Sequence, residues 1–139
     1  MENSQLVESF EALFNVIKRL RGPGGCPWDI AQTPMSMRKS LLEEAYEAAD
    51  AIEEHHSTGQ NAEHVKEELG DILLNVLMIS YMYEQEGLFS TADIMKNLTE
   101  KLIRRHPHVF GETEGYEGPE SDKKASTPES VLNQWENIK

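Results

Sequence analysis

Apolar residues recur at steps of three and four along most of this 139-residue chain, which is the pattern of amphipathic helices. The first such segment spans about residues 4–21 and is stopped by the "GPGG" at 22–25. No convincing strand alternation occurs anywhere in the sequence. We therefore expect an all-α protein, a bundle of four or five helices. The stripe of the first helix consists of Leu6, Phe10, Leu13, Phe14, Ile17 and Leu20.

A second helix is expected after a loop that extends to about residue 33. Thr33 followed by Pro34 is typical of an N-cap with proline at the first helical position. The helix should run to about His56, with Gly59 as its C-terminal stop. Its predicted core stripe consists of Met37, Leu41, Ala45, Ala48 and Ile52.

A third helix is expected over about residues 62–86. Asn61 can cap its start and Gly87 ends it. Because the turn around Asn61 is short, the second and third helices should be antiparallel neighbours. The apolar stripe of the third helix consists of Val65, Leu69, Ile72, Val76 and Tyr83.

The C-terminal third predicts two more helices with a long polar segment between them. Ser90 can cap a fourth helix over about 91–106, and Pro107 stops it. Residues 111–127 are rich in Gly, Ser and charge and poor in aliphatic residues, which predicts a mobile loop. A last short helix is expected over about 128–138.

Size and charge restrict the class of protein. A chain of 139 residues fits one domain, 1–139, with a real core. The 25 acidic residues against 13 Lys and Arg give a net charge of -12, which disfavours binding to a nucleic-acid polymer. The single cysteine excludes an internal disulfide framework. Without a run of eighteen apolar residues or a signal-peptide pattern, we expect a cytoplasmic protein with no membrane partner.

Two clusters of acidic residues lie on the second and third helices, in "LLEEAYEAAD" and "KEELGDILLN". An α-helix turns by about 100° per residue, so Glu44 and Glu47 are neighbours on one face. Glu68 and Asp71 have the same spacing on the next helix. Each pair holds the same place relative to its apolar stripe. If the two apolar stripes pack against each other, the two acidic pairs can meet beside the contact between the helices.

Two interpretations of these acids remain open from spacing alone. Four carboxylates that meet would need counter-charge, and Mg²⁺ is a hard ion that takes oxygen ligands and binds together with substrate phosphates. A solvated acidic face is about as well supported, since acids three apart are common on surface helices. The repeated register slightly favours a metal site. His55 and His56 are out of register with the acids, which argues against iron.

The segment "KLIRRHPHVFG" is the only dense basic stretch of this acidic chain. Lys101 and Arg105 are four apart and Arg104 is three from Lys101, so one helix face could hold phosphate oxygens. Pairing of these cations with the helix C-terminus is the commoner explanation. Trp28 and Trp135 could each stack on a base, although a core or interface anchor is more typical of tryptophan.

Five sequence blocks, in order and over nearly the whole chain, resemble the MazG-type nucleoside triphosphate pyrophosphohydrolases. They are "GCPWDIAQT", "LLEEAYEAADAI", "EELGDILLNV", "KLIRRHPHVFG" and "VLNQWENIK". The resemblance implies an all-α fold completed by dimerisation into a helical bundle, as a dimer or a dimer of dimers. Long members of that family carry two such domains in tandem, and this chain is similar to the N-terminal one.

The resemblance also implies an activity and a set of site residues. The activity is Mg²⁺-dependent hydrolysis of NTPs or dNTPs to monophosphate and pyrophosphate, by attack of a metal-activated water at the α-phosphorus, with Mn²⁺ as a substitute metal. Implied metal ligands are Glu44, Glu47, Glu68 and Asp71, with Glu43 beside them or orienting water. Implied substrate-binding residues are Lys101 and Arg105 for phosphate and Trp135 for the base, with Arg104 and Trp28 as further candidates.

Two alternatives stay open beside this hypothesis. One is a related all-α pyrophosphatase that acts on dUTP, phosphoribosyl-ATP or an alarmone; the "GCPWD" and "RRHPHVFG" blocks favour the MazG type over it. The other is a non-catalytic helical interaction module whose acidic face docks a basic partner. The sequence does not indicate the preferred base.

Overall fold

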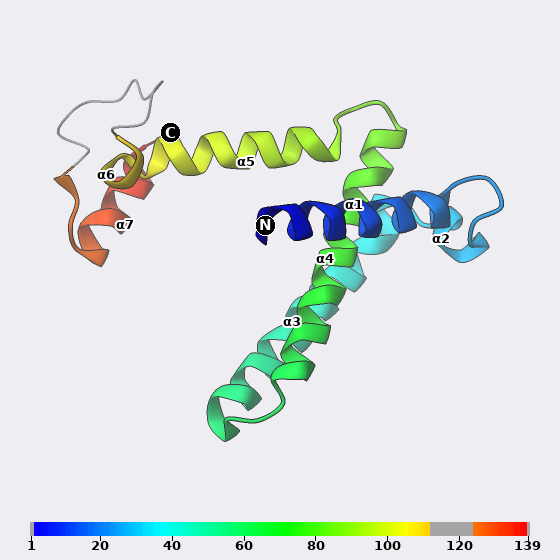
Figure 1. Ribbon diagram of the computed structural model, residues 1–139, viewed down its shortest axis with the longest axis horizontal. Coiled ribbons are helices and arrows are strands. Elements are labelled where there is room, and N and C mark those ends of the chain that lie inside the picture. Colours follow the sequence, from blue (N-terminus) through cyan, green and yellow to red (C-terminus); the bar gives the residue numbers. More distant parts are fainter. Residues whose placement is uncertain (1, 112–123, 139) are drawn as a thin grey trace. The chain divides into compact units, whose positions relative to one another are not determined.

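The computed structural model describes residues 2–111 and 124–138, which are mostly helical, and no strand occurs among these residues (Figure 1). The all-α prediction is confirmed. Two compact units, Met1–Thr91 and Ala92–Lys139, are described separately below. The helices are α1 (Glu2–Arg21), α2 (Pro27–Ala31), α3 (Pro34–Thr58), α4 (Ala62–Gln85), α5 (Thr91–Arg105), α6 (Pro107–Phe110) and α7 (Pro128–Asn137).

The first unit is organised around a hairpin of α3 and α4, which lie side by side (Figure 1). Thr33 and Ser36 form a capping box at the start of α3, with Thr33 Oγ1 accepting from the Ser36 amide at 3.1 Å. Gly59 ends α3 in the left-handed conformation, at φ 69°. Both ends of this helix are confirmed. Asn61 is also left-handed, at φ 65°, but its side chain does not cap α4.

A small apolar core lies where α1 crosses the C-terminal half of α4. Ile17 of α1 is fully buried, and it packs with Met37 of α3 and with side chains of α4. Near the other half of α4 the buried residues of α3 are Ala48 and Ala51, whose small side chains let the two helices approach closely. The α4 members of the core are Leu77, Met78 and Met82.

The apolar stripe predicted for the third helix does not form part of the buried core of the single chain, although Val65, Ile72 and Tyr83 are half-buried. None of its five residues is buried, and Leu69 and Val76 are 50% and 42% exposed. The stripe of the second helix is wrong in part, because Ile52 is 51% exposed while Met37 and Ala48 are buried. The buried positions of α4 include three polar residues instead, namely Glu68, Asn75 and Ser80.

The segment predicted as a loop before α3 contains the short helix α2. Arg21 holds this segment through a side-chain bond to the Gln32 carbonyl at 3.0 Å and another to the Asp29 carbonyl. Gly25 is required here, because a Cβ atom at this position would come within 2.2 Å of the Leu20 carbonyl oxygen. The "GPGG" stretch therefore stops α1 and also allows the chain to fold closely against the end of that helix.

The second unit consists of α5, the short helix α6 and α7. The predicted ends of the fourth helix agree to within a residue, and Pro107 begins α6, which was not predicted. Thr127 caps α7 in a capping box with Ser130. Most of the predicted mobile loop, residues 112–123, lies outside the described residues. No described helix is both long enough and apolar enough to span a membrane.

Candidate functional site

Three of the predicted acids meet inside the hairpin. Glu44 comes from α3, and Glu68 and Asp71 come from α4. One carboxylate oxygen of each residue lies within 4.8 Å of the others. Glu68 is buried, and the other two are half-buried. We call this cluster the carboxylate trio. The two acidic segments therefore do converge, as their matching register on the two helices predicts.

The trio has unmet bonding capacity. Glu44 Oε2 and Glu68 Oε2 are both buried, and neither has a hydrogen-bond partner within the described part of the chain. A buried carboxylate oxygen without a partner is costly, and native structures rarely leave one so. An all-oxygen donor set is what a hard divalent cation such as Mg²⁺ prefers. The trio fits such an ion better than it fits water-facing acids.

Burial and the crowding of negative charge raise the pKa of Glu44 above its ordinary value. Burial is the largest cause, followed by the charges of Glu47, Asp71 and Glu68, and a hydrogen bond with Glu47 adds to the effect. A carboxyl group with these neighbours holds its proton more strongly than one in water. A cation at the trio would reverse this effect, because it favours the ionised form.

The remaining predicted acids lie at the edge of the trio or outside it. Glu47 is exposed and close enough to Glu44 to accept a hydrogen bond from its protonated form, so it lies beside the trio without being a member. Glu43 is also exposed, and its carboxylate pairs with Lys39 at 3.5 Å on the outer side of α3. The structure thus separates Glu43 from the three converging acids.

Sequence reasoning missed two polar residues of α4 next to the trio. His64 Nε2 lies 3.2 Å from Glu68 Oε1, and the spacing of four residues could have revealed this contact. Asn75 follows Asp71 by one turn and is only 4% exposed. Its Nδ2 donates to the Asp71 carbonyl at 2.9 Å. Polar residues therefore continue along the inner face of α4 on both sides of the trio.

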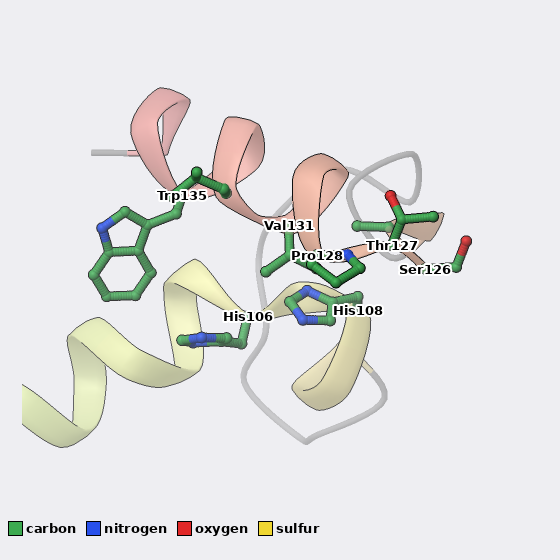
Figure 2. A pocket seen from close by; sticks show the side chains of 9 residues that line it. His106, His108, Ser126, Thr127, Pro128, Val131 and Trp135 are labelled. Atoms are coloured by element: carbon green, nitrogen blue, oxygen red, sulfur yellow. The ribbon is translucent and has the colours of Figure 1, made fainter. Parts of the chain in front are cut away.

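The predicted base-stacking tryptophan borders an open groove in the second unit, with a volume of about 680 Å³. Figure 2 shows the rings of His106 and His108 turned toward α7, with Trp135 at one end of the groove. Trp135 is half-buried, and the Arg105 guanidinium carbon lies 4.8 Å from its ring centroid. The imidazole of His106 is 5.2 Å from the same ring. We call this feature the α7 groove.

The predicted phosphate-binding residues lie on α5. Lys101 and Arg105 are half-buried and share one face, whereas Arg104 is exposed. Arg105 Nε is buried and lacks a hydrogen-bond partner among the residues that the structure describes. Trp28 lies on α2 and is 63% exposed, so it is not a core residue of the single chain, and an interface anchor or a contact with the base stays a prediction.

Comparisons with known proteins agree on one family. The family model described as "MazG nucleotide pyrophosphohydrolase domain" matches residues 32–110. The chain is 42% identical over 130 residues to "Nucleoside triphosphate pyrophosphohydrolase/pyrophosphatase MazG" of Thermotoga maritima, which covers 94% of this chain and 44% of that protein. It is 37% identical over 134 residues to "Nucleoside triphosphate pyrophosphohydrolase" of Escherichia coli K12. That match covers 96% of this chain and 45% of the Escherichia coli protein.

Two further matches concern a longer relative and the fold. "Uncharacterized protein YabN" of Bacillus subtilis is 41% identical over 138 residues, which is 99% of this chain and 25% of that protein. The chain thus spans less than half the length of these relatives. A crystal structure of a MazG-related protein from Thermotoga maritima has the same fold, with a TM-score of 0.66 at 22% identity, covering 91% of this chain and 96% of that one.

Proposed function

The chain belongs to the MazG nucleotide pyrophosphohydrolase family, and on this basis we propose that it hydrolyses nucleoside triphosphates to monophosphate and pyrophosphate. Relatives that carry this activity in their names support the proposal. The observation that carries it is the carboxylate trio with its two buried oxygens that lack partners. A hydrolase for triphosphates needs a cation to offset phosphate charge, and the trio provides a place for one.

Glu44, Glu68 and Asp71 would hold Mg²⁺, with Mn²⁺ as a substitute, and the exposed Glu47 is close enough to Glu44 to join them. When bound, the metal offsets the charge of the phosphates and makes an attacking water more acidic. The chain's own contribution is to fix the carboxylates on two packed helices, so that little reorganisation is needed. Glu43 is exposed and pairs with Lys39, so it would act only from outside the trio, beside the ligands or by orienting water.

The cationic face of α5 and the α7 groove would bind the nucleotide. Arg105 has a buried Nε without a partner in the described residues, so a phosphate oxygen could satisfy it. Lys101 shares this face, and the exposed Arg104 is a more distant candidate. The ring of Trp135 offers a stacking platform for the base. Trp28 remains a candidate for contact with the substrate from its exposed position on α2.

We also propose that the hairpin is an interface between two copies of this chain, in a dimer or a dimer of dimers. Tyr46 and Leu42 on α3 are 75% and 59% exposed, and Leu69 and Leu73 on α4 are 50% and 43% exposed. Exposed apolar residues in this density on neighbouring helices mark an interaction surface. A second copy would bury the apolar stripe of α4 that the single chain leaves open.

The test is pyrophosphate release in the presence of Mg²⁺ across the eight common NTPs and dNTPs. Guanosine tetraphosphate, dUTP and phosphoribosyl-ATP would be included, because turnover restricted to one of these would favour the alternative substrate classes. We expect Glu68→Ala and Asp71→Ala to abolish release while the far-UV spectrum stays helical. The control is Glu67→Ala, an exposed acid beside Glu68. No release by the wild-type protein on any substrate would favour a non-catalytic module.

A further inference from the structure

A chain of polar contacts extends from the α3–α4 turn to the carboxylate trio. Asn61 Nδ2 donates to Glu54 Oε1 at 2.8 Å. The other oxygen of Glu54 lies 3.7 Å from His64 Nδ1. His64 Nε2 is 3.2 Å from Glu68 Oε1, and donates to it because a carboxylate oxygen only accepts. The left-handed backbone of Asn61, at φ 65°, places this side chain in the turn instead of capping α4.

The two oxygens of Glu68 therefore have different surroundings. Oε1 is held by His64, and Oε2 is buried without a partner in the described part of the chain. The terminal torsion of a glutamate side chain is broad, so packing alone fixes the plane of its carboxylate poorly. A donor on one oxygen removes this freedom and fixes where the other oxygen points.

We propose that His64 is a positioning residue that orients Glu68 for a divalent cation. This inference rests on the proposed function to the extent that the trio holds a metal ion. Hydrogen-bonded partners of carboxylate ligands act in this way at metal sites, and their loss typically lowers metal affinity by 10- to 100-fold. None of the acidic motifs of the sequence includes His64, Glu54 or Asn61.

A purely structural role fits these residues less well. The side chains of His64 and Glu54 are 46% and 47% exposed, and ion pairs with this exposure contribute little to stability. Only Glu68 in this chain of contacts is buried, with 12% of its side chain exposed. Loss of His64 should therefore affect the orientation of Glu68 more than the folding of the hairpin.

The experiment is a titration of the full chain with Mn²⁺ alone, followed by electron paramagnetic resonance of the free ion. We expect His64→Ala to weaken Mn²⁺ binding by about 10- to 100-fold. His64→Gln retains an N–H donor on a side chain of similar reach, and should restore most of the affinity. The matched control is His56→Ala, an exposed histidine on the same hairpin. Circular dichroism confirms that each variant folds.

A second readout separates positioning from catalysis. In pyrophosphate-release assays His64→Ala should require about 10- to 100-fold more Mg²⁺ for half-maximal rate, with kcat at saturating Mg²⁺ close to wild type. Unchanged Mn²⁺ affinity in His64→Ala would overturn the inference, and so would equal losses in His64→Ala and His64→Gln. If the wild-type protein binds Mn²⁺ but releases no pyrophosphate, the proposed function fails while the Mn²⁺ titration still decides the role of His64.

Discussion

Replacing Glu44 by glutamine should stabilise the protein without metal and remove most of its response to Mg²⁺. The reason lies in the carboxylate trio, whose three oxygens lie within 4.8 Å of one another. Burial and the nearby charges of Glu47, Asp71 and Glu68 raise the pKa of Glu44, which means that its ionised form is disfavoured in the folded state. Glutamine removes the charge and keeps the size, and its amide group can donate to the neighbouring carboxylates.

The size of the effect follows from Coulomb's law. Two unit charges 4.8 Å apart repel by about 3.5 kcal/mol at an effective dielectric constant of about 20. Glu44 takes part in two of the three repulsive pairs of the trio. Because Glu44 and Asp71 are half-exposed, water screens these pairs, and we expect a net stabilisation of about 1–3 kcal/mol. For a chain of this size that corresponds to a rise in Tm of about 4–10 °C.

The contribution of Glu44 to folding stability changes with pH in a definite direction. Between the unfolded pKa of Glu44, about 4.3, and its raised folded pKa, the folded state binds more protons than the unfolded state. The stability that this group contributes is therefore present at low pH and is lost as the pH rises through that window. The advantage of Glu44→Gln over the wild-type protein without metal should widen over the same window and then level off.

The assay is thermal unfolding, followed by circular dichroism, in EDTA and in saturating MgCl₂. We expect the order of stability to reverse, with Glu44→Gln above wild type in EDTA and below it with Mg²⁺. Glu53→Gln is the matched control, because Glu53 is an exposed acid on the same helix, and it should follow wild type in both buffers. A Glu44→Gln protein no more stable than wild type in EDTA at neutral pH would refute the electrostatic argument.

Three other substitutions test the proposed phosphate contact, the proposed dimer and the close turn after α1. Lys101→Ala should raise KM about 10- to 100-fold with a smaller change in kcat, because a charge-assisted hydrogen bond contributes about 1.5–3 kcal/mol. Steady-state kinetics on the best NTP substrate would measure both constants. Tyr46→Glu places a charge on a side chain that is 75% exposed in one chain, and light scattering should detect a shift from dimer toward monomer. Gly25→Ala should lower stability by about 1–3 kcal/mol in urea unfolding, because the new Cβ would meet the Leu20 carbonyl oxygen at 2.2 Å.

The ends of the long helices could be predicted because they depend on local chemistry. Thr33, Pro34 and Gly59 determine the limits of α3 through a capping box and a left-handed turn, and these need no tertiary partner. Asn61 shows the limit of such rules. Its side chain bonds Glu54 of the preceding helix instead of capping α4, a choice that depends on where α3 lies.

The convergence of the acids could also be predicted, but the face of α4 that carries them could not. Periodicity identified an apolar stripe through Leu69 and Val76 and placed it in the core, whereas both residues are exposed. A hydrophobic pattern shows which residues avoid water and does not show which surface covers them. The contact of His64 with Glu68 could be predicted from their spacing of four residues. A role for His64 could not, because a histidine near acidic residues has many common roles.

The two faces of α4 explain why the acidic motif and the apolar stripe occur together in one helix. Its inner face carries Glu68, Asp71 and Asn75, polar residues that gain little free energy by packing on α3 alone. Its outer face carries Leu69 and Leu73, which gain free energy only when another surface covers them. A cation bound inside the hairpin would stabilise the polar inner face of α4. A second chain packed on the outside would bury its apolar outer face. On this argument the proposed site and the proposed dimer would both be consequences of the same arrangement of residues on α4.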